Sequence, residues 1–189
     1  MFSRGFKTWC EEFSVQIRRE MGRAAVSPLD PFELAKVLDV NVCKPYQLAD
    51  LPAEVSQRLV DKYAGSWSAV TVSHGGLHLI VYNPTHSRVR RNSDVMHELA
   101  HILLEHEPTQ VFFSPRSGFA LRTHDKVQES EASWLAGSLL LPRPALFYIR
   151  KRGLDDGMAC EEFGVSEDLL RFRMNVTGVN IQIKRTRAR

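Results

Sequence analysis

Apolar side chains recur every three or four residues along most of the chain, which predicts a largely helical protein. Residues 6–21 carry this spacing with charges between the apolar positions, as an amphipathic helix does. Asp30 and Pro31 suit the cap and the first position of a short helix over 32–38. We expect residues 1–45 to form a helical scaffold.

Alternating and β-branched residues replace this spacing in the middle of the chain. Residues 67–73 and 77–82 read WSAVTVS and LHLIVY, and the His-Gly-Gly between them is typical of a hairpin. Residues 40–42 favour a further short strand, and 48–63 should be helical. The sequence therefore predicts an α+β fold in which a small antiparallel sheet lies among helices.

A strongly patterned helix is predicted directly after the sheet, over residues 93–107. Apolar residues at helical spacing give it one face for the core, Ser93 is a suitable cap, and Pro108 stops it. The arginine-rich run 87–91 has no aromatic residues interleaved. We expect this run to be a solvated connector and not a phosphate-binding patch.

His97, Glu98 and His101 form an H-E-x-x-H motif inside this helix. Residues four apart lie on one helix face, so the two imidazoles can bind one ion, and zinc most often takes such a pair. Glu98 is rotated by about 100° around the axis. Its carboxylate can then take a proton from metal-bound water, which predicts Glu98 as a general base.

A third protein ligand for the zinc is expected from a second helix, over 127–141, which offers Glu129 and Glu131. The two carboxylates are separated by about 200° around the helix. Glu131 shares a face with Leu135 and Leu139 and should point inward, where a carboxylate needs a partner. We predict Glu131 as the ligand, with Glu129 as the alternative.

The segment between the two helices, 109–125, has no periodicity and is predicted to be a loop, where active-site walls are often found. Phe112, Phe113 and Phe119 fit a substrate cleft and a core position equally well. His124 is a candidate for stabilising an oxyanion, although an ordinary loop histidine is the more frequent case.

Length and charge indicate one domain, because 189 residues suit a single core. We expect this domain over 1–178, with a helical part over 143–178. The four cationic residues after position 183 exceed the net charge of +3, so the body of the chain is close to neutral. Residues 179–189 are expected to form a basic tail that need not be ordered.

The three cysteines, Cys10, Cys43 and Cys160, are far apart and odd in number, which argues against a disulfide framework. Free thiols of this kind favour a reducing cytoplasm. The chain has no run of 18 apolar residues and no continuous apolar stretch near its start. We therefore expect neither a membrane span nor a secretory signal.

Residues 160–173 have the outline of a helix-turn-helix, with Gly164 in the turn and Ser166 as the next cap. With the basic tail, this outline makes direct DNA binding an alternative function. The second helix begins with Glu167 and Asp168, however, which phosphates would repel. We expect the segment to pack into the body of the protein.

The two motif helices resemble those of the ImmA/IrrE family of zinc metallo-endopeptidases. The sequence HELAH at 97–101, followed by EASWLAGSLLLP at 131–142, is similar to the family's HELxH helix and its second helix of the form E-A-x-x-[FL]-A-x-x-L-L-x-P. The likeness covers roughly residues 31–178. Position 133 often holds Asn or Asp in such proteins and holds Ser here.

The resemblance implies a zincin-like fold, with zinc held by His97, His101 and Glu131 and with Glu98 as catalytic base. It also implies a protein substrate, such as a repressor or another transcriptional regulator. A sheet edge before the metal helix can hold an extended peptide by main-chain hydrogen bonds, although a hairpin that only covers the core fits the same pattern. The alternative function is a DNA-binding or protein-interaction regulator with structural or vestigial zinc.

Overall fold

The computed structural model describes residues 2–106, 111–113, 120–122 and 125–187. The elements in these ranges are α1 (Phe6–Glu20), α2 (Pro31–Val37), β1 (Asn41–Cys43), the short 3-10 helix η1 (Pro45–Gln47), α3 (Ala53–Val60), β2 (Ala69–His74), β3 (Leu77–Tyr82), α4 (Arg88–Leu103), β4 (Val111–Phe113), β5 (Ala120–Arg122), α5 (Lys126–Leu140), α6 (Arg143–Arg152), α7 (Asp156–Phe163), α8 (Glu167–Thr177) and α9 (Val179–Arg187). The predicted α+β class is confirmed, with helices dominant.

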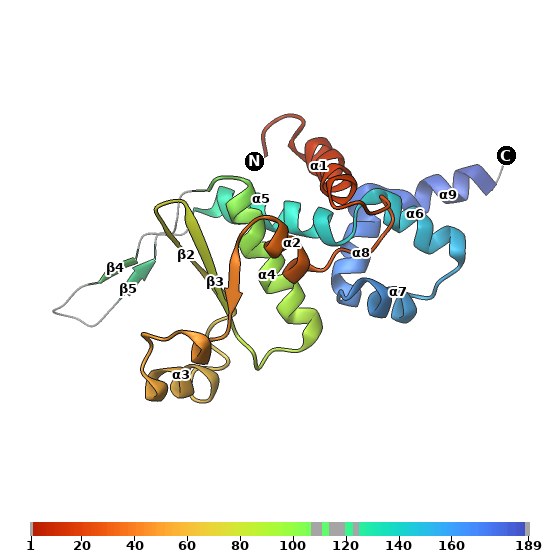
Figure 1. Ribbon diagram of the computed structural model, residues 1–189. Helices are drawn as coiled ribbons and strands as arrows, with labels where there is room; N and C mark the ends of the chain where they lie inside the picture. The colour runs from red at the N-terminus through yellow and green to blue at the C-terminus, as the bar shows by residue number, and fades with distance from the viewer. Residues whose placement is uncertain (1, 107–110, 114–119, 123–124, 188–189) are drawn as a thin grey trace.

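Three strands form one sheet in the order β1–β3–β2 (Figure 1). β2 pairs antiparallel with β3, as the predicted hairpin requires, whereas β1 pairs parallel with β3, with Asn41 opposite Leu79. The prediction of a purely antiparallel sheet is therefore wrong. The parallel pair is possible because α3 and β2 intervene along the chain and allow it to return in the same direction. β2 is left at one edge of this sheet.

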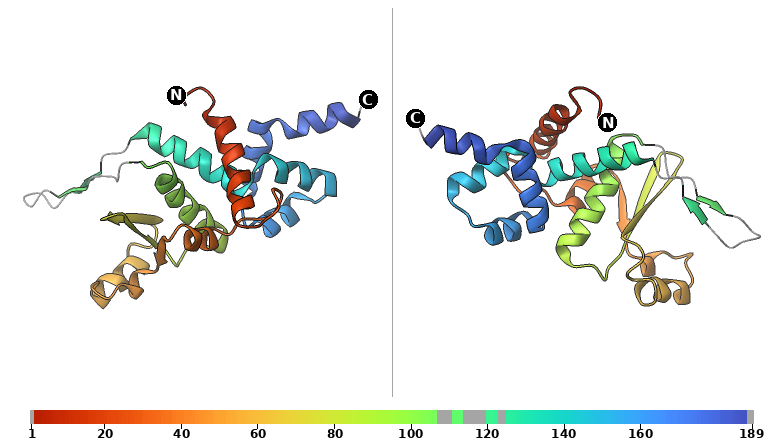
Figure 2. Two further views of the ribbon diagram at one scale, coloured as in Figure 1. Left: turned by 45° about the horizontal axis from the view of Figure 1, so that its top comes forward. Right: turned by 180° about the vertical axis from the view of Figure 1, so that it is seen from behind.

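The core lies where the sheet, α4 and α5 meet. α4 packs against β2 and β3 and also along α5, while α1 crosses α5 from the other side (Figures 1 and 2). Ile80 of β3, Leu99 of α4 and Leu135 and Leu139 of α5 are fully buried there. Helices α6 to α9 gather at the end of α5 away from the sheet, so the predicted helical C-terminal part is present.

Buried guanidinium groups hold the carboxyl end of α5. Arg18 of α1 donates from Nη2 to the Leu139 carbonyl at 2.7 Å, and Arg173 of α8 donates from Nε to the Leu141 carbonyl at 3.0 Å. Neither arginine is exposed to solvent. Burial lowers the pKa of Arg18 to about 10, so it stays charged at neutral pH. Positive charge is favourable here because the last carbonyls of a helix carry partial negative charge and lack helical partners.

α4 begins earlier than the sequence indicates. Its cap is Ser87, whose hydroxyl accepts from the backbone N–H of Arg90 at 3.3 Å, and not Ser93. The expected connector 87–91 is therefore the cap and first turn of α4. This first turn holds one apolar residue, Val89, among three arginines, which is why the apolar pattern alone places the start too late.

Two other segments contain elements that the sequence pattern did not predict. β4 and β5 pair antiparallel inside the predicted loop, with Phe112 opposite Leu121. The expected tail forms α9, because Val179 is fully buried and Ile183, four residues later, packs against the core from the same helix face.

The segment that resembles a helix-turn-helix forms α7 and α8. Ser166 caps α8 as predicted, with its hydroxyl accepting from Leu169 N at 3.2 Å. Phe163, Leu170 and Met174 are buried, which confirms that this segment packs into the body of the protein. Across the described ranges, no helix combines the length and apolar character that a membrane crossing requires.

Candidate metal centre

α4 presents the two histidines of the motif side by side. Val95, Leu99 and Ala100 are fully buried and fix the rotation of the helix, so that His97 and His101 both face its half-buried side. Their Nε2 atoms lie 3.1 Å apart. The motif prediction that one helix face carries both imidazoles is therefore met by the geometry.

Glu129 in the first turn of α5 completes a group of three. Its Oε2 lies 3.2 Å from His97 Nε2 and its Oε1 lies 3.6 Å from His101 Nε2. Ligand atoms around a tetrahedral zinc at about 2.0–2.1 Å lie about 3.3 Å from one another. The three donors thus have the spacing and the mixed nitrogen–oxygen chemistry that a zinc ion takes. Among the described residues, they form the one group of three histidine, cysteine or acidic side chains whose ligand atoms lie close enough together to bind a metal ion.

Glu131, the ligand that the sequence favoured, is not a member of this group. It points inward as predicted, but its Oε2 lies 3.4 Å from Nε2 of His106, just beyond the end of α4. The inward carboxylate does have a partner, as the burial argument requires, and that partner is a histidine outside the motif. Among the described residues, the carboxylate that lies beside both motif histidines is therefore Glu129, the alternative, and not Glu131.

A second signal in the sequence points to Glu129. Ser133 lies four residues later, on the same face of α5, and its hydroxyl is 3.5 Å from Nδ1 of His97. Glu129 and Ser133 therefore form an i, i+4 pair that faces the i, i+4 pair of α4. The family pattern marks position 133, and stepping back one helical turn from it leads to Glu129.

Glu98 faces the sheet. Thr71 of the edge strand β2 donates a hydrogen bond from Oγ1 to Oε2 of Glu98. Sequence reasoning missed Thr71, because nothing in a strand pattern shows which residue will lie across from a helix. This bond fixes the orientation of the carboxylate next to the histidine pair.

A hollow of about 370 Å³ adjoins the group on its α5 side. Its walls are mainly aromatic and come from Phe2, Trp134 and Phe172, with Glu129, Ser130 and Ser133 on the side of the histidines. Trp134 packs edge-on against Phe2 and against Phe172, with ring centroids 5.4 and 5.8 Å apart.

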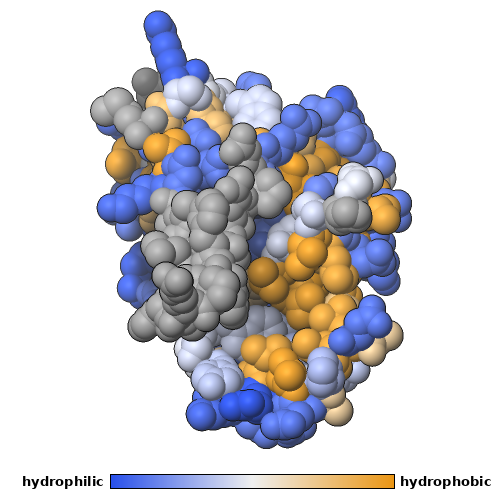
Figure 3. Space-filling model, turned by 90° about the vertical axis from the view of Figure 1, so that its left-hand side faces the viewer, coloured by the Kyte–Doolittle hydropathy of each residue, from blue (hydrophilic) through white to orange (hydrophobic). Residues whose placement is uncertain are grey.

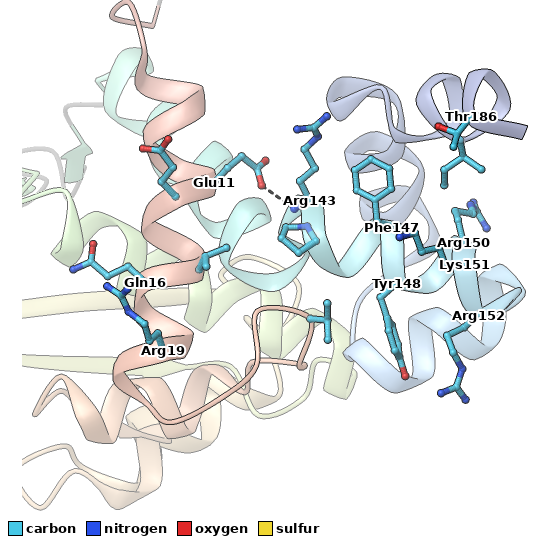
Figure 4. A pocket seen from close by; sticks show the side chains of 15 residues that line it. Glu11, Gln16, Arg19, Arg143, Phe147, Tyr148, Arg150, Lys151, Arg152 and Thr186 are labelled. Atoms are coloured by element: carbon cyan, nitrogen blue, oxygen red, sulfur yellow. Dashed lines mark hydrogen bonds between the residues drawn. The ribbon is translucent and has the colours of Figure 1, made fainter. Parts of the chain in front are cut away.

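A larger hollow of about 1280 Å³ lies elsewhere, between α1, α6 and α9 (Figure 4). Figure 4 shows Glu11 of α1 reaching the start of α6, where it accepts from Arg143 N at 2.8 Å. None of the residues that line it belongs to α4 or α5. It is therefore separate from the histidine pair.

Some residues singled out in the sequence cannot be placed. Phe119 and His124 lie outside the described residues, and so do the side chains of Phe112 and Phe113. The cleft and oxyanion roles considered for them remain predictions.

Comparison with known proteins gives a family match. Residues 55–175, more than half of the chain, match the family model described as Peptidase_M78, IrrE N-terminal-like domain. The matched range contains both motif helices and the edge strand β2. A search of curated proteins finds no matching relative.

Proposed function

The chain belongs to the Peptidase_M78 family of IrrE N-terminal-like domains, and from this membership we propose that it is a zinc-dependent endopeptidase. Membership confirms the resemblance to ImmA/IrrE proteins, and it brings a metallopeptidase activity with a protein substrate. We further propose that the metal is zinc, that Glu98 is the general base, and that the target is a transcriptional regulator in the cytoplasm.

His97, His101 and Glu129 would hold the metal, leaving one position of a tetrahedral zinc for water. The observation that carries this proposal is that donors from two helices lie 3.1 to 3.6 Å from one another. When bound, the ion supplies polarisation of the substrate carbonyl and a water that ionises near neutral pH.

Glu98 performs the proton transfers in this proposal. Its carboxylate takes a proton from the attacking water and then delivers it to the leaving amine. The Thr71 hydroxyl occupies one carboxylate oxygen and leaves the other for the water. Because Thr71 belongs to β2, the base and the substrate-binding edge are held in a fixed relation to each other.

β2 is suited to align the substrate. In the described part of the chain it has a neighbouring strand on one side only, so the groups along its other side can pair with an extended peptide. Figure 3 shows a continuous apolar area on the face at this end of the molecule. Val72 and Leu77 of the hairpin are among the exposed apolar residues. Apolar substrate residues could be buried on such a surface, and also in the aromatic hollow beside Trp134.

The DNA-binding alternative has less support. The helix that would read DNA, α8, begins with Glu167 and Asp168, and it turns Leu170 and Met174 into the core. Phosphates would repel the first pair, and the second pair is needed for packing. If duplex binding at low salt is absent, this alternative is excluded.

The test pairs metal analysis with cleavage. Glu98→Gln should bind one zinc per chain, as the wild type does, yet lose cleavage of a regulator encoded nearby by about 100-fold or more. Zinc is measured by elemental analysis of the purified full chain, and cleavage by gel electrophoresis. Persistent cleavage by Glu98→Gln would remove the assigned base, and a wild type that binds no zinc would refute the metal site.

A further inference from the structure

We infer that His106, with the carboxylate of Glu131 close to its other ring nitrogen, positions His101 as a metal ligand. The inference rests on the proposed metal centre and assigns a role to two residues that do not themselves belong to the group of three donors.

The end of α4 is shaped so that His106 returns over His101. Glu105 adopts a left-handed conformation, with φ of 52°. The N–H of Glu105 then bonds the Ile102 carbonyl, and the N–H of His106 bonds the His101 carbonyl, both at 3.0 Å. These two bonds define a Schellman motif, in which the residue after the left-handed one contacts the third residue from the helix end. That contact is usually apolar, and here it joins two imidazoles.

The positions of the ring protons on His101 and His106 follow from the proposed metal site. His101 faces His97 and Glu129 through Nε2, so a metal there leaves the proton of His101 on Nδ1. Nδ1 of His101 lies 3.0 Å from Nδ1 of His106, so Nδ1 of His106 must accept the hydrogen bond from His101. The proton of His106 is then on Nε2, 3.4 Å from the carboxylate of Glu131. Every donor in the series His101–His106–Glu131 thus faces an acceptor.

The pair is shielded from water. The His106 side chain is 7% exposed and that of Glu131 is 21% exposed. Among the described residues, His106 provides the nitrogen that lies within 4 Å of the Glu131 carboxylate. A carboxylate linked through an imidazole to a ligand orients the ligand ring and raises its basicity, and losing such a partner typically weakens metal binding about 10- to 100-fold.

The structure also offers a matched control. His86, just before α4, has its Nδ1 2.6 Å from Oδ2 of Asp94, and its side chain is likewise 7% exposed. This is a second buried histidine–carboxylate pair beside the same helix, and it does not include a metal-binding candidate. Replacing His86 tests what the loss of such a pair does to the fold alone.

The experiment measures the zinc dissociation constant of the full chain by competition with a chromophoric chelator. We expect His106→Phe to weaken zinc binding about 10- to 100-fold and His86→Phe to change it less than about twofold. Glu131→Gln retains an acceptor for His106 and should give a smaller loss. The absorption spectrum of bound Co²⁺ should also shift in His106→Phe, because the field at His101 changes.

The double variant separates a positioning role from direct ligation. If Glu131 acts through His106, Glu131→Gln should add no further loss in the His106→Phe background. A further large loss would show that Glu131 acts on the metal by itself and would overturn the inference. So would an unchanged zinc affinity in His106→Phe, or an equal loss in His86→Phe. No zinc binding by the wild type would instead refute the proposed metal centre, and the inference with it.

Discussion

At the scale of the residue, two carboxylates two positions apart on α5 have different neighbours. Glu129 contacts both motif histidines through its two oxygens, whereas Glu131 contacts His106. One is therefore placed to bind an ion directly and the other to act through an imidazole. Their charges are the same, so only geometry separates their roles.

The two roles predict unequal effects of the same substitution. Glu129→Gln replaces an anionic ligand by a neutral amide, so zinc affinity should fall by more than the roughly 100-fold that marks the upper end for a residue hydrogen-bonded to a ligand. Glu131→Gln should stay below that value. Zinc competition titrations of the two variants check this directly. A larger loss in Glu131→Gln would restore the assignment that the sequence favoured.

The motif residues could be predicted because His97, Glu98 and His101 are related within one helix. Helical spacing alone fixes the angle between them. The third ligand could not be predicted in the same way. The inward direction of Glu131 follows from the apolar stripe of α5, but which carboxylate meets the imidazoles depends on how α5 is rotated against α4. Only tertiary packing sets that rotation.

At the scale of the element, α5 is fixed at both ends. Asp125 caps its first turn by accepting from the N–H groups of Val127 and Gln128, and this is the turn that carries Glu129. Arg18 and Arg173 bind the carbonyls at its other end. A helix that must present a ligand to a neighbouring helix gains from such anchoring, because rotation about its axis would move the carboxylate.

Arg18→Lys tests the anchoring. Lysine keeps the charge but cannot reach the carbonyls of Ser27 and Leu139 at once, as the guanidinium does at 2.8 and 2.7 Å. Because a buried acceptor left without a donor costs about 1–3 kcal/mol, the free energy of unfolding should fall by about that amount. Arg19→Lys on the same helix changes an exposed residue and should stay within about 0.5 kcal/mol. Urea unfolding compares them, and equal effects would contradict the anchoring.

Elements with a strong apolar face were predicted well, and those without one were not. α1, the hairpin β2–β3 and the apolar part of α4 lie close to their predicted positions. The first turn of α4 has little apolar pattern because three of its residues are arginines. The parallel pairing of β1 with β3 joins residues 38 positions apart, as Asn41 opposite Leu79 shows. No local pattern records such a pairing.

At the scale of the whole molecule, the N-terminal scaffold packs against the helix that carries Glu129, part of the candidate metal centre, although the scaffold lies outside the matched range 55–175. α1 crosses α5 and supplies both Arg18 and the fully buried Cys10 to the contact (Figure 2). Cys10 lies close enough to Glu131 for the two charges to interact. The first helix is thus coupled to the segment that holds the carboxylates, and its docking should contribute to the stability of the whole fold.

The docking of α1 can be tested through the pH dependence of the free energy of unfolding, because the Cys10 thiol is buried at this contact. Burial is the main cause that raises the pKa of Cys10 to about 12, and the charges of Glu11 and Glu131 act in the same direction. In the unfolded chain the thiol ionises near its ordinary value of 9.0. Between these two values the unfolded state binds fewer protons than the folded state, so stability must fall as pH rises. Well below pH 9 the thiol is neutral in both states and contributes no slope.

The expected result is a difference between wild type and Cys10→Ala. From pH 8 to pH 10 the free energy of unfolding should fall by about 1 kcal/mol more in the wild type than in the variant, because alanine has no proton to lose. Any cavity left by alanine costs the same at both pH values and cancels from the comparison. Cys43→Ala serves as the comparison: burial also raises the pKa of that partly buried thiol, but its removal should change the pH dependence less than removal of Cys10. Parallel pH dependence of wild type and Cys10→Ala in urea unfolding would show that α1 does not hold this thiol buried against α5.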